Sequence, residues 1–171
     1  MAITIRPARP SDIPAITEIY NEGGVGTTAS YDLEPVTVED RTAWFLAKQT
    51  RAFPTLVALD EGAVIGYSGY GTFRDKAGYD FTVEHSVYVR DGYRTSGVGR
   101  MLMAALIDYA RGHGVHAMLG VLDAENEASL AFHKRLGFVE VGRLPEVGRK
   151  FGRWLDVVFV QLTFPGPILD D

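Results

Sequence analysis

The chain has 171 residues, of which 46% are hydrophobic and 23% charged, with a formal net charge of −5 at pH 7. This length and composition predict one domain over residues 1–171, with a core from about 3 to 164 and a C-terminal tail over 165–171. The acidic balance argues against a nucleic-acid binder, and the absence of cysteine excludes disulfides, thiolate metal ligands and an acyl-cysteine intermediate.

The first half of the chain predicts two helices and then a strand-rich segment. Ser11 is placed to cap the first helix, and Thr37 with Asp40 has the spacing of a capping box that opens the second. The expected elements, in chain order, are a strand over 3–6, a helix from Ser11 to the glycines at 23–26, a loop over 27–32, a helix over 37–48 and a hairpin of strands 55–59 and 64–71 around Asp60-Glu61-Gly62.

In the second half, strands alternate with helices. The expected elements are a loop over 73–79, a strand over 81–89, a helix over 97–111, a strand over 117–122, a helix over 126–136, strands over 138–143 and 155–163, and a frayed tail marked by Pro165 and Pro167. This order indicates an α/β protein with a mixed sheet and helices on both of its faces.

The most informative stretch is the connection between the strand that ends at Val89 and the helix that begins near Gly97. Such a connection points free backbone N–H groups and the positive end of a helix dipole at one place, which favours an anion. Gly97 and Gly99 carry no Cβ, so a phosphate can approach their backbone closely. Arg94 and Arg100 flank the turn with forked donors that suit phosphate oxygens. The sequence therefore predicts a site for a pyrophosphate.

Two familiar phosphate sites do not match this stretch. A P-loop requires Gly-x-x-x-x-Gly-Lys-Ser/Thr, which does not occur in the sequence. A Rossmann fingerprint requires a third glycine where this chain has Leu102, and its glycines follow the strand directly, whereas about seven residues intervene here. A dinucleotide site is therefore disfavoured.

The string Arg-x-x-Gly-x-Gly over 94–99 resembles the GNAT superfamily of acetyl-CoA-dependent N-acetyltransferases. Asn126 and the Leu-Gly-Phe ending at Phe138 fall where that family has its second cofactor-binding helix and the strand after it. The strings over 82–89 and 150–156 are similar to the phosphinothricin and methionine sulfoximine/sulfone acetyltransferase branch. The resemblance covers about residues 3–164 and implies a GNAT fold, in which two central parallel strands splay apart to admit the pantetheine arm.

The resemblance also implies the cofactor contacts. The main chain of the central strand pairs with the pantetheine amides, the loop amides hold the pyrophosphate, and two further side chains contact CoA. The residues implied are Val87, Tyr88, Val89, Arg94, Thr95, Ser96, Gly97, Val98, Gly99, Arg100, Asn126 and Arg135.

Glu84 is the candidate general base. It is the one carboxylate in a largely apolar strand, and alternation places it on the face opposite His85. A half-buried carboxylate has a raised pKa, which suits a base that takes a proton from an amine near neutral pH. The matching glutamate is the general base proposed for the resembled enzymes. The alternative is a structural hydrogen-bond acceptor.

The candidate general acid is His133, which shares a polar stripe of its helix with Asn126 and Ser129. Many GNAT enzymes carry a tyrosine there that is thought to protonate the departing thiolate. This chain departs from that pattern, although the phosphinothricin branch also has a histidine near this place, so His133 is the expected substitute for the tyrosine. The alternative is a helix-surface histidine without a role. His85 is expected to be a core residue, and the histidines lack metal-ligand spacing, so no metal is expected.

The acceptor pocket is implied by the resemblance alone. In the resembled branch the loop over 73–79 and the region from Thr27 to Tyr31 surround a small amino acid, with Arg74 on its carboxylate and the residues from 150 to 154 closing the opening. The alternative for Arg74 is an exposed, solvated side chain. The substrate-binding residues are Arg74, Ala77, Gly78 and Tyr79. A basic cluster of Arg143, Arg149, Lys150 and Arg153 is either a solvated surface or the rim of an anionic substrate's site.

Together with the resemblance, these residues predict an enzyme that acetylates the α-amino group of a small amino-acid-like acceptor by direct attack in a ternary complex. The resemblance makes methionine sulfoximine, methionine sulfone and phosphinothricin the leading acceptors. The alternatives are a protein N-terminal or lysine acetyltransferase and a non-catalytic sensor of acetyl-CoA. We expect a homodimer with acetyl-CoA as co-substrate, without metal, nucleic-acid or membrane partners. Neither a signal peptide nor a membrane-spanning run is apparent, so a cytoplasmic location is expected.

Overall fold

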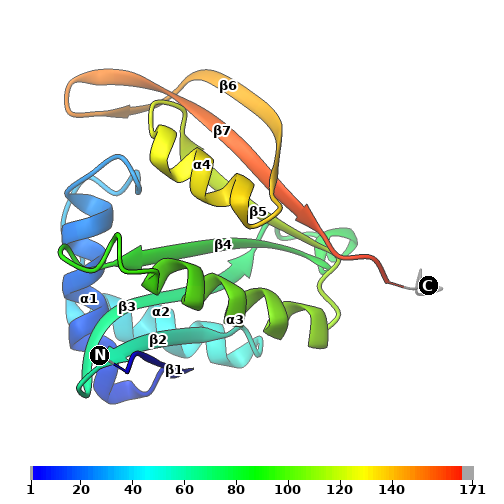
Figure 1. The fold of residues 1–171 in the computed structure, drawn as a ribbon. Coiled ribbons are helices and arrows are strands. Elements are labelled where there is room, and N and C mark those ends of the chain that lie inside the picture. The colour runs from blue at the N-terminus through cyan, green and yellow to red at the C-terminus, as the bar shows by residue number, and fades with distance from the viewer. Residues whose placement is uncertain (1, 167–171) are drawn as a thin grey trace.

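One sheet of seven strands organises residues 2–166, the part of the chain that the computed structural model describes. The strand order is β1-β2-β3-β4-β5-β7-β6 (Figure 1). The elements are β1 (Thr4–Pro7), α1 (Ile13–Tyr20), α2 (Val38–Thr50), β2 (Thr55–Asp60), β3 (Ala63–Thr72), β4 (Thr82–Val89), α3 (Val98–Gly112), β5 (Ala117–Asp123), α4 (Glu127–Arg135), β6 (Val139–Lys150) and β7 (Arg153–Thr163).

The pairing of β4 with β5 determines where the sheet opens. It is the one parallel pair among the described strands, and its register covers only Thr82 with Ala117, Val83 with Met118 and Glu84 with Leu119. Beyond Glu84 the two strands diverge, as Figure 1 shows. The expected mixed sheet with a splayed parallel pair is therefore confirmed.

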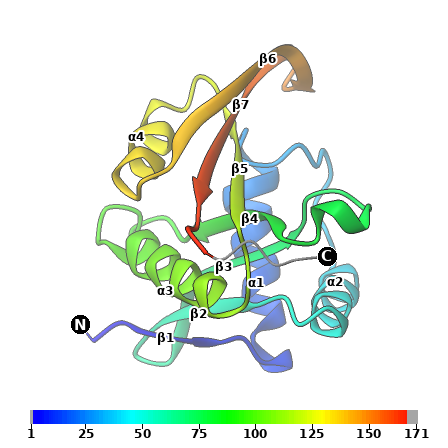
Figure 2. The same cartoon turned by 90° about the vertical axis from the view of Figure 1, so that its right-hand side faces the viewer.

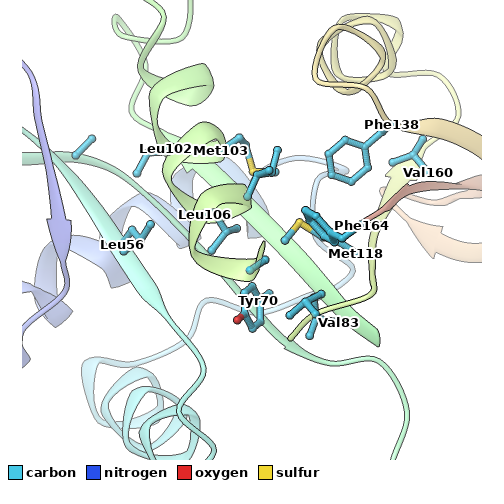
Figure 3. Packing of buried hydrophobic residues seen from close by; sticks show 14 of the residues in the cluster. Leu56, Tyr70, Val83, Leu102, Met103, Leu106, Met118, Phe138, Val160 and Phe164 are labelled. Carbon is cyan, nitrogen blue, oxygen red and sulfur yellow. The ribbon is translucent and has the colours of Figure 1, made fainter. Parts of the chain in front are cut away.

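Helices cover both faces of the sheet, with α3 and α4 on one side and α1 and α2 on the other (Figure 2). The larger core lies under α3, whose Leu102, Met103 and Leu106 are wholly buried against strand residues such as Val83 and Met118 (Figure 3). A second core packs Ile13, Ile16 and Ile19 of α1 against β2 and β3. Burial of this apolar surface fixes the position of β4 between the two layers.

Several local signals act as predicted. Thr37 and Asp40 form the reciprocal capping box at the start of α2. Glu61 and Gly62 turn the β2–β3 hairpin with φ values of 48° and 86°. Asn126 caps α4 by accepting a hydrogen bond from the Ser129 amide over 3.0 Å.

The predicted Ser11 cap is wrong. Ser11 is exposed within a 3-10 turn over Pro10–Asp12, and α1 begins two residues later. Asp12 holds this start instead, because its carboxylate accepts hydrogen bonds of 2.7 Å from the Arg9 amide and from the Arg6 guanidinium. The ion pair with Arg6 is the main cause that lowers the pKa of Asp12.

The predicted strand over 138–143 is too short. β6 continues to Lys150 and forms a long hairpin with β7 through Phe151 and Gly152, whose φ values are 53° and 75°. Pro145 lies where the β6–β7 register is irregular, between Leu144 and Gly148, so the strand accommodates a residue without an N–H. Pro167, predicted in the tail, lies outside the described residues.

Candidate active site

A cavity of about 540 Å³ opens where β4 and β5 part. Its lining includes side chains from both faces of β4, so it connects the two sides of the sheet. Glu84, Ser86 and Tyr88 come from one face and His85, Val87 and Val89 from the other. The loop over 27–31 lines the cavity on the side of Glu84, and α4 lines it with Asn126, Ala128, Ser129, Phe132 and His133.

The start of α3, where the sequence predicts an anion site, forms one end of the cavity. Gly97 is the N-cap and has a φ of 84°, a left-handed conformation that suits glycine. Gly99 has space for a close backbone approach, with Phe132 beside it. Arg94 lines the cavity and forms an ion pair of 3.0 Å with Asp91. The first amides of α3 therefore present donors and the positive end of the helix dipole.

The predicted cofactor residues fall into two groups. Those whose atoms line the cavity are Val87, Tyr88, Val89, Arg94, Gly99 and Asn126. The others do not line the cavity: they belong to the loop before α3, the first turn of α3 and the last residue of α4, and they are Thr95, Ser96, Gly97, Val98, Arg100 and Arg135. The side chain of Val98 is wholly buried in the core, so that residue has only its main chain to offer a ligand.

The edge of β4 that faces β5 is open past Glu84. In the described part of the chain, no strand pairs with this edge between residues 85 and 89, because the β4–β5 register ends at Leu119. The extended backbone there has N–H and C=O groups that an extended ligand can pair with, as an added strand does.

Glu84 faces the cavity from the last paired position of β4. Its carboxylate makes no hydrogen bond or ion pair with any of residues 2–166, which disfavours a structural hydrogen-bond role. Its side chain is open to the cavity, yet the surrounding protein removes enough water to raise the pKa of Glu84 above its ordinary 4.5. The arrangement suits a group that accepts a proton near neutral pH.

His133 is buried in the cavity wall, with an exposed fraction of 2%. Its Nδ1 lies 2.8 Å from the Ser129 carbonyl oxygen, which only accepts, so Nδ1 carries the proton. Burial lowers the pKa of His133, so the ring is neutral near pH 7. Its role as a proton donor stays a prediction, and this role needs a second proton on Nε2 that burial opposes.

His85 is buried, as expected for a core residue, and neither ring nitrogen has a hydrogen-bond partner among the described residues. Burial lowers its pKa to about 3, and repulsion from His133 adds to the effect. Its ring packs beside Gly120, where a Cβ would lie only 2.8 Å from Nε2. The ring occupies the space that the small residue leaves on β5, at the point where the two strands part.

The predicted acceptor-binding residues do not line this cavity. They are exposed on the loop before β4 and its 3-10 turn over Ala77–Tyr79, and they are Arg74, Ala77, Gly78 and Tyr79. The guanidinium of Arg74 lies 5.3 Å from the Phe73 ring centroid. The loop leaves β3 soon after Gly71, which pairs with Glu84, so it begins near the cavity even though its side chains point elsewhere.

The basic cluster does not form a shared rim. Arg143 and Arg153 form ion pairs with Glu140 and Glu125 at 3.5 and 2.6 Å. The guanidinium of Arg149 stacks on Trp154, 5.6 Å from its ring centroid. Lys150 is buried, which the clustering of basic residues in the sequence does not reveal.

Sequence reasoning missed the contacts that fix the loop over 27–31. The hydroxyl of Thr28 donates a hydrogen bond to the Asp123 carboxylate at the end of β5. The hydroxyls of Tyr20 and Ser30 lie 2.7 Å apart. In the sequence, Asp123 stands at the end of an apolar strand, and this is the one feature that could have pointed to its contact with the loop.

Within residues 2–166 no three potential ligands are grouped to hold a metal, and no helix is long and apolar enough to cross a bilayer.

Comparison with known proteins agrees with this geometry. The Acetyltransferase (GNAT) family matches residues 14–138. An L-methionine sulfoximine/L-methionine sulfone acetyltransferase of Pseudomonas paraeruginosa is 47% identical, with 95% of each chain covered. A phosphinothricin N-acetyltransferase of Streptomyces coelicolor is 35% identical, with 93% of this chain and 95% of the relative covered.

A solved acetyltransferase of Salmonella typhimurium, bound to its cofactor acetyl-CoA, has a TM-score of 0.96 at 42% identity and covers 100% of this chain and 99% of its own. The fold, the open edge of β4 and the glycine-led start of α3 agree with these similarities. The chain belongs to the GNAT family of acetyltransferases.

Proposed function

We propose that the protein transfers the acetyl group of acetyl-CoA to the α-amino group of a small amino-acid-like acceptor of the methionine sulfone, methionine sulfoximine or phosphinothricin type. One observation carries the proposal: a single cavity joins the amides at the start of α3 to an unpartnered, raised-pKa carboxylate across the sheet. The names of the relatives, and the acetyl-CoA in the Salmonella structure, support the choice of substrates.

The cradle fits acetyl-CoA. The amides from Thr95 to Arg100 and the guanidinium of Arg94 suit the pyrophosphate. The open edge of β4 from Val87 to Val89 suits the two pantetheine amides, with Asn126 and Arg135 further along. This path ends with the thioester where the strands part, beside Glu84. A main-chain N–H near Val87 would then stabilise the oxyanion.

The proposed reaction is a direct transfer. Glu84 takes a proton from the acceptor's ammonium, and the neutral amine attacks the thioester carbonyl. The carbon–sulfur bond of the tetrahedral intermediate then breaks to release the CoA thiolate, and the nitrogen loses its second proton to water or to that thiolate to give the neutral amide. A covalent acetyl-enzyme would need a nucleophile. The chain lacks cysteine, and the hydroxyl of Ser86, which lines the cavity, has no hydrogen-bond partner among the described residues to activate it.

His133 enters this reaction only if a second ring proton reaches Nε2, because its resting form is neutral with its proton on Nδ1. A thiol has a pKa of about 8.5, so the thiolate is able to depart before it is protonated. We therefore assign the essential proton transfer to Glu84 and leave the thiolate's protonation to His133 or to water.

Arg74 is the proposed partner of the acceptor's carboxylate. It lies outside the cavity lining, but its loop begins next to the strand position paired with Glu84, and an arginine side chain is long and mobile.

We also propose a homodimer. Exposed apolar side chains on the β6–β7 hairpin support self-association, and they are Val139, Val141, Leu144, Val147 and Trp154. An enzyme that consumes acetyl-CoA is expected in the cytoplasm.

Thiol release from acetyl-CoA tests the proposal. The acceptors are L-methionine sulfone, L-methionine sulfoximine, phosphinothricin, L-methionine, and peptides with a free N-terminus or lysine. We expect amine-dependent thiol release with the first three and intersecting lines in double-reciprocal plots. Parallel lines with a trappable acetyl-enzyme would refute the direct route. Turnover of the peptides alone would make the enzyme a protein acetyltransferase, and acetyl-CoA binding without turnover would make it a sensor.

A further inference from the structure

Lys150 is a buried lysine at the end of β6, with an exposed fraction of 4%. Its ammonium donates hydrogen bonds of 2.6 Å to the Thr27 carbonyl and 2.7 Å to the Ser30 carbonyl, and it lies 3.4 Å from the Gly24 carbonyl. Within residues 2–166, no carboxylate lies within ion-pair distance of it. The ammonium also lies 5.3 Å from the centroid of the Phe151 ring. A buried ammonium held by carbonyl oxygens without a carboxylate partner is an unusual and costly arrangement.

The Thr27 and Ser30 carbonyls belong to the loop over 27–31, which lines the cavity on the side of Glu84. Lys150 itself is not part of the cavity lining, so it holds the loop from behind. In Figure 1 the orange tip of the β6–β7 hairpin lies beside the blue loop that follows α1. The loop and the hairpin also meet at Gly148, where any side chain would overlap the ring of Tyr31. The hairpin is therefore fitted to this loop.

Peptide geometry gives the contact a consequence for the cavity. A trans peptide unit holds its C=O and N–H on opposite sides. The N–H groups of Thr28 and Tyr31, which follow the two carbonyls bound most closely by Lys150, therefore point away from the lysine. Neither N–H donates a hydrogen bond to another described residue, and both residues line the cavity. Hydrogen bonding of a carbonyl to a cation polarises its peptide unit and strengthens the N–H as a donor.

We propose that Lys150 is a positioning residue that sets acceptor selectivity: it holds and polarises the loop so that the N–H groups of Thr28 and Tyr31 receive an oxygen of a sulfone, sulfoximine or phosphinate. This inference rests on the proposed acetyl transfer to such acceptors. A sulfone offers two oxygen acceptors, whereas the thioether of methionine is only a weak acceptor. The loop therefore discriminates between two side chains of similar length by the hydrogen bonds that they accept.

The test substitutes Lys150→Met, which keeps an unbranched apolar stem and removes the donors. The measured quantity is the ratio of kcat/KM for L-methionine sulfone to that for L-methionine, together with the Kd of acetyl-CoA. Lys150→Met should lower the ratio roughly tenfold, mainly through the KM of the sulfone. The Kd of acetyl-CoA should stay within about twofold, because α3 and the edge of β4 hold the cofactor. Lys150→Arg, which restores a cation, should recover part of the ratio.

Arg149→Met is the matched control, because Arg149 lies next in the chain, is exposed and stacks on Trp154. It should keep the wild-type ratio. An unchanged ratio in Lys150→Met would overturn the proposal. So would an equal loss for both acceptors accompanied by weaker acetyl-CoA binding, because that pattern describes a general structural role.

A measurement on the wild-type protein covers the case in which Lys150→Met does not fold. With CoA present, methionine sulfone should slow amide hydrogen exchange at Thr28 and Tyr31, and methionine should not. Equal exchange with both ligands would overturn the selectivity role. If the wild-type protein turns over the acceptors and Lys150→Met has the same selectivity, the role of Lys150 is refuted and the proposed function stands. If the wild-type protein releases no thiol with any amine, the proposed function and this inference are both refuted.

Discussion

His85 and His133 stack ring against ring in the wall of the cavity, with ring centroids 5.1 Å apart and planes 28° apart. Phe138 packs edge-on against both rings, at 5.2 and 5.3 Å. Burial lowers the pKa of each histidine, to about 3 for His85. The pair is therefore uncharged near neutral pH and forms an apolar wall where β4 and β5 diverge.

The pair predicts a loss of stability in mild acid. A histidine whose folded pKa is lowered stabilises the fold above its unfolded pKa of about 6.5, and this contribution is lost as the pH falls below that value. The free energy of unfolding should decrease between pH 6.5 and 5 by up to about 1.4 kcal/mol per pH unit for each histidine. Urea unfolding at a series of pH values measures it. His133→Leu should reduce the slope, while His113→Gln, an exposed change at the C-cap of α3, should keep it. A pH-independent wild type would contradict the buried neutral pair.

Glu84→Gln should lower kcat/KM by roughly 10²–10⁴-fold, the range for loss of a general base. Because the raised pKa lies above 4.5, wild-type activity should fall on the acid side as Glu84 is protonated, and the variant should lack this acid limb. The pKa of Glu84 is higher in the folded than in the unfolded protein, so the ionised side chain destabilises the fold at any pH above the unfolded value. Glu84→Gln removes this cost, and its Tm near pH 7 should therefore be unchanged or higher. Glu127→Gln on α4 is the control. A variant with wild-type rate and acid limb would remove Glu84 from the chemistry.

Gly97→Ala should weaken acetyl-CoA binding by about tenfold. At a φ of 84° an alanine is strained by roughly 1–2 kcal/mol, and relief of the strain moves the amides that begin α3. Calorimetric titration with acetyl-CoA measures the effect. Gly112→Ala, at the other end of the same helix and with open space around its Cβ position, should leave the Kd unchanged. Equal affinities in both variants would place the pyrophosphate elsewhere.

Arg74→Ala should raise the KM of the acceptor roughly tenfold and leave the KM of acetyl-CoA unchanged, as expected for loss of one charge-assisted contact to a carboxylate. Initial rates with each substrate varied in turn separate the two. Lys76→Ala removes a neighbouring cation from the same exposed loop and serves as the control. Should both variants behave alike, Arg74 would be an ordinary solvated side chain.

The central part of this architecture was accessible from the sequence because its signals are local. The period-two pattern of β4 places Glu84 and His85 on opposite faces, and the structure shows the same arrangement. Gly97 marks the helix start for a steric reason, because its φ of 84° is a conformation that residues with a Cβ rarely adopt.

The other features depend on contacts that a local pattern does not contain. Lys150 reaches carbonyls 120 and more residues away, and nothing in its neighbourhood distinguishes it from a surface lysine. β6 is largely exposed, so it shows no alternation that would have carried the strand past Pro145. The course of the loop over 73–79 is likewise set by its surroundings, which is why Arg74 falls outside the cavity that its sequence position suggested.

Because the sheet is open between β4 and β5, the cavity is lined from both faces of β4, and the proposed reaction would bring the two reactants together from opposite sides of the sheet. A covalent conjugate of the acceptor's nitrogen and the sulfur of coenzyme A, joined by a short linker, would thread this opening and bind both halves as one molecule. Once one half is bound, the tethered half loses little further translational and rotational entropy. Such a bisubstrate inhibitor should therefore bind far more tightly than either fragment.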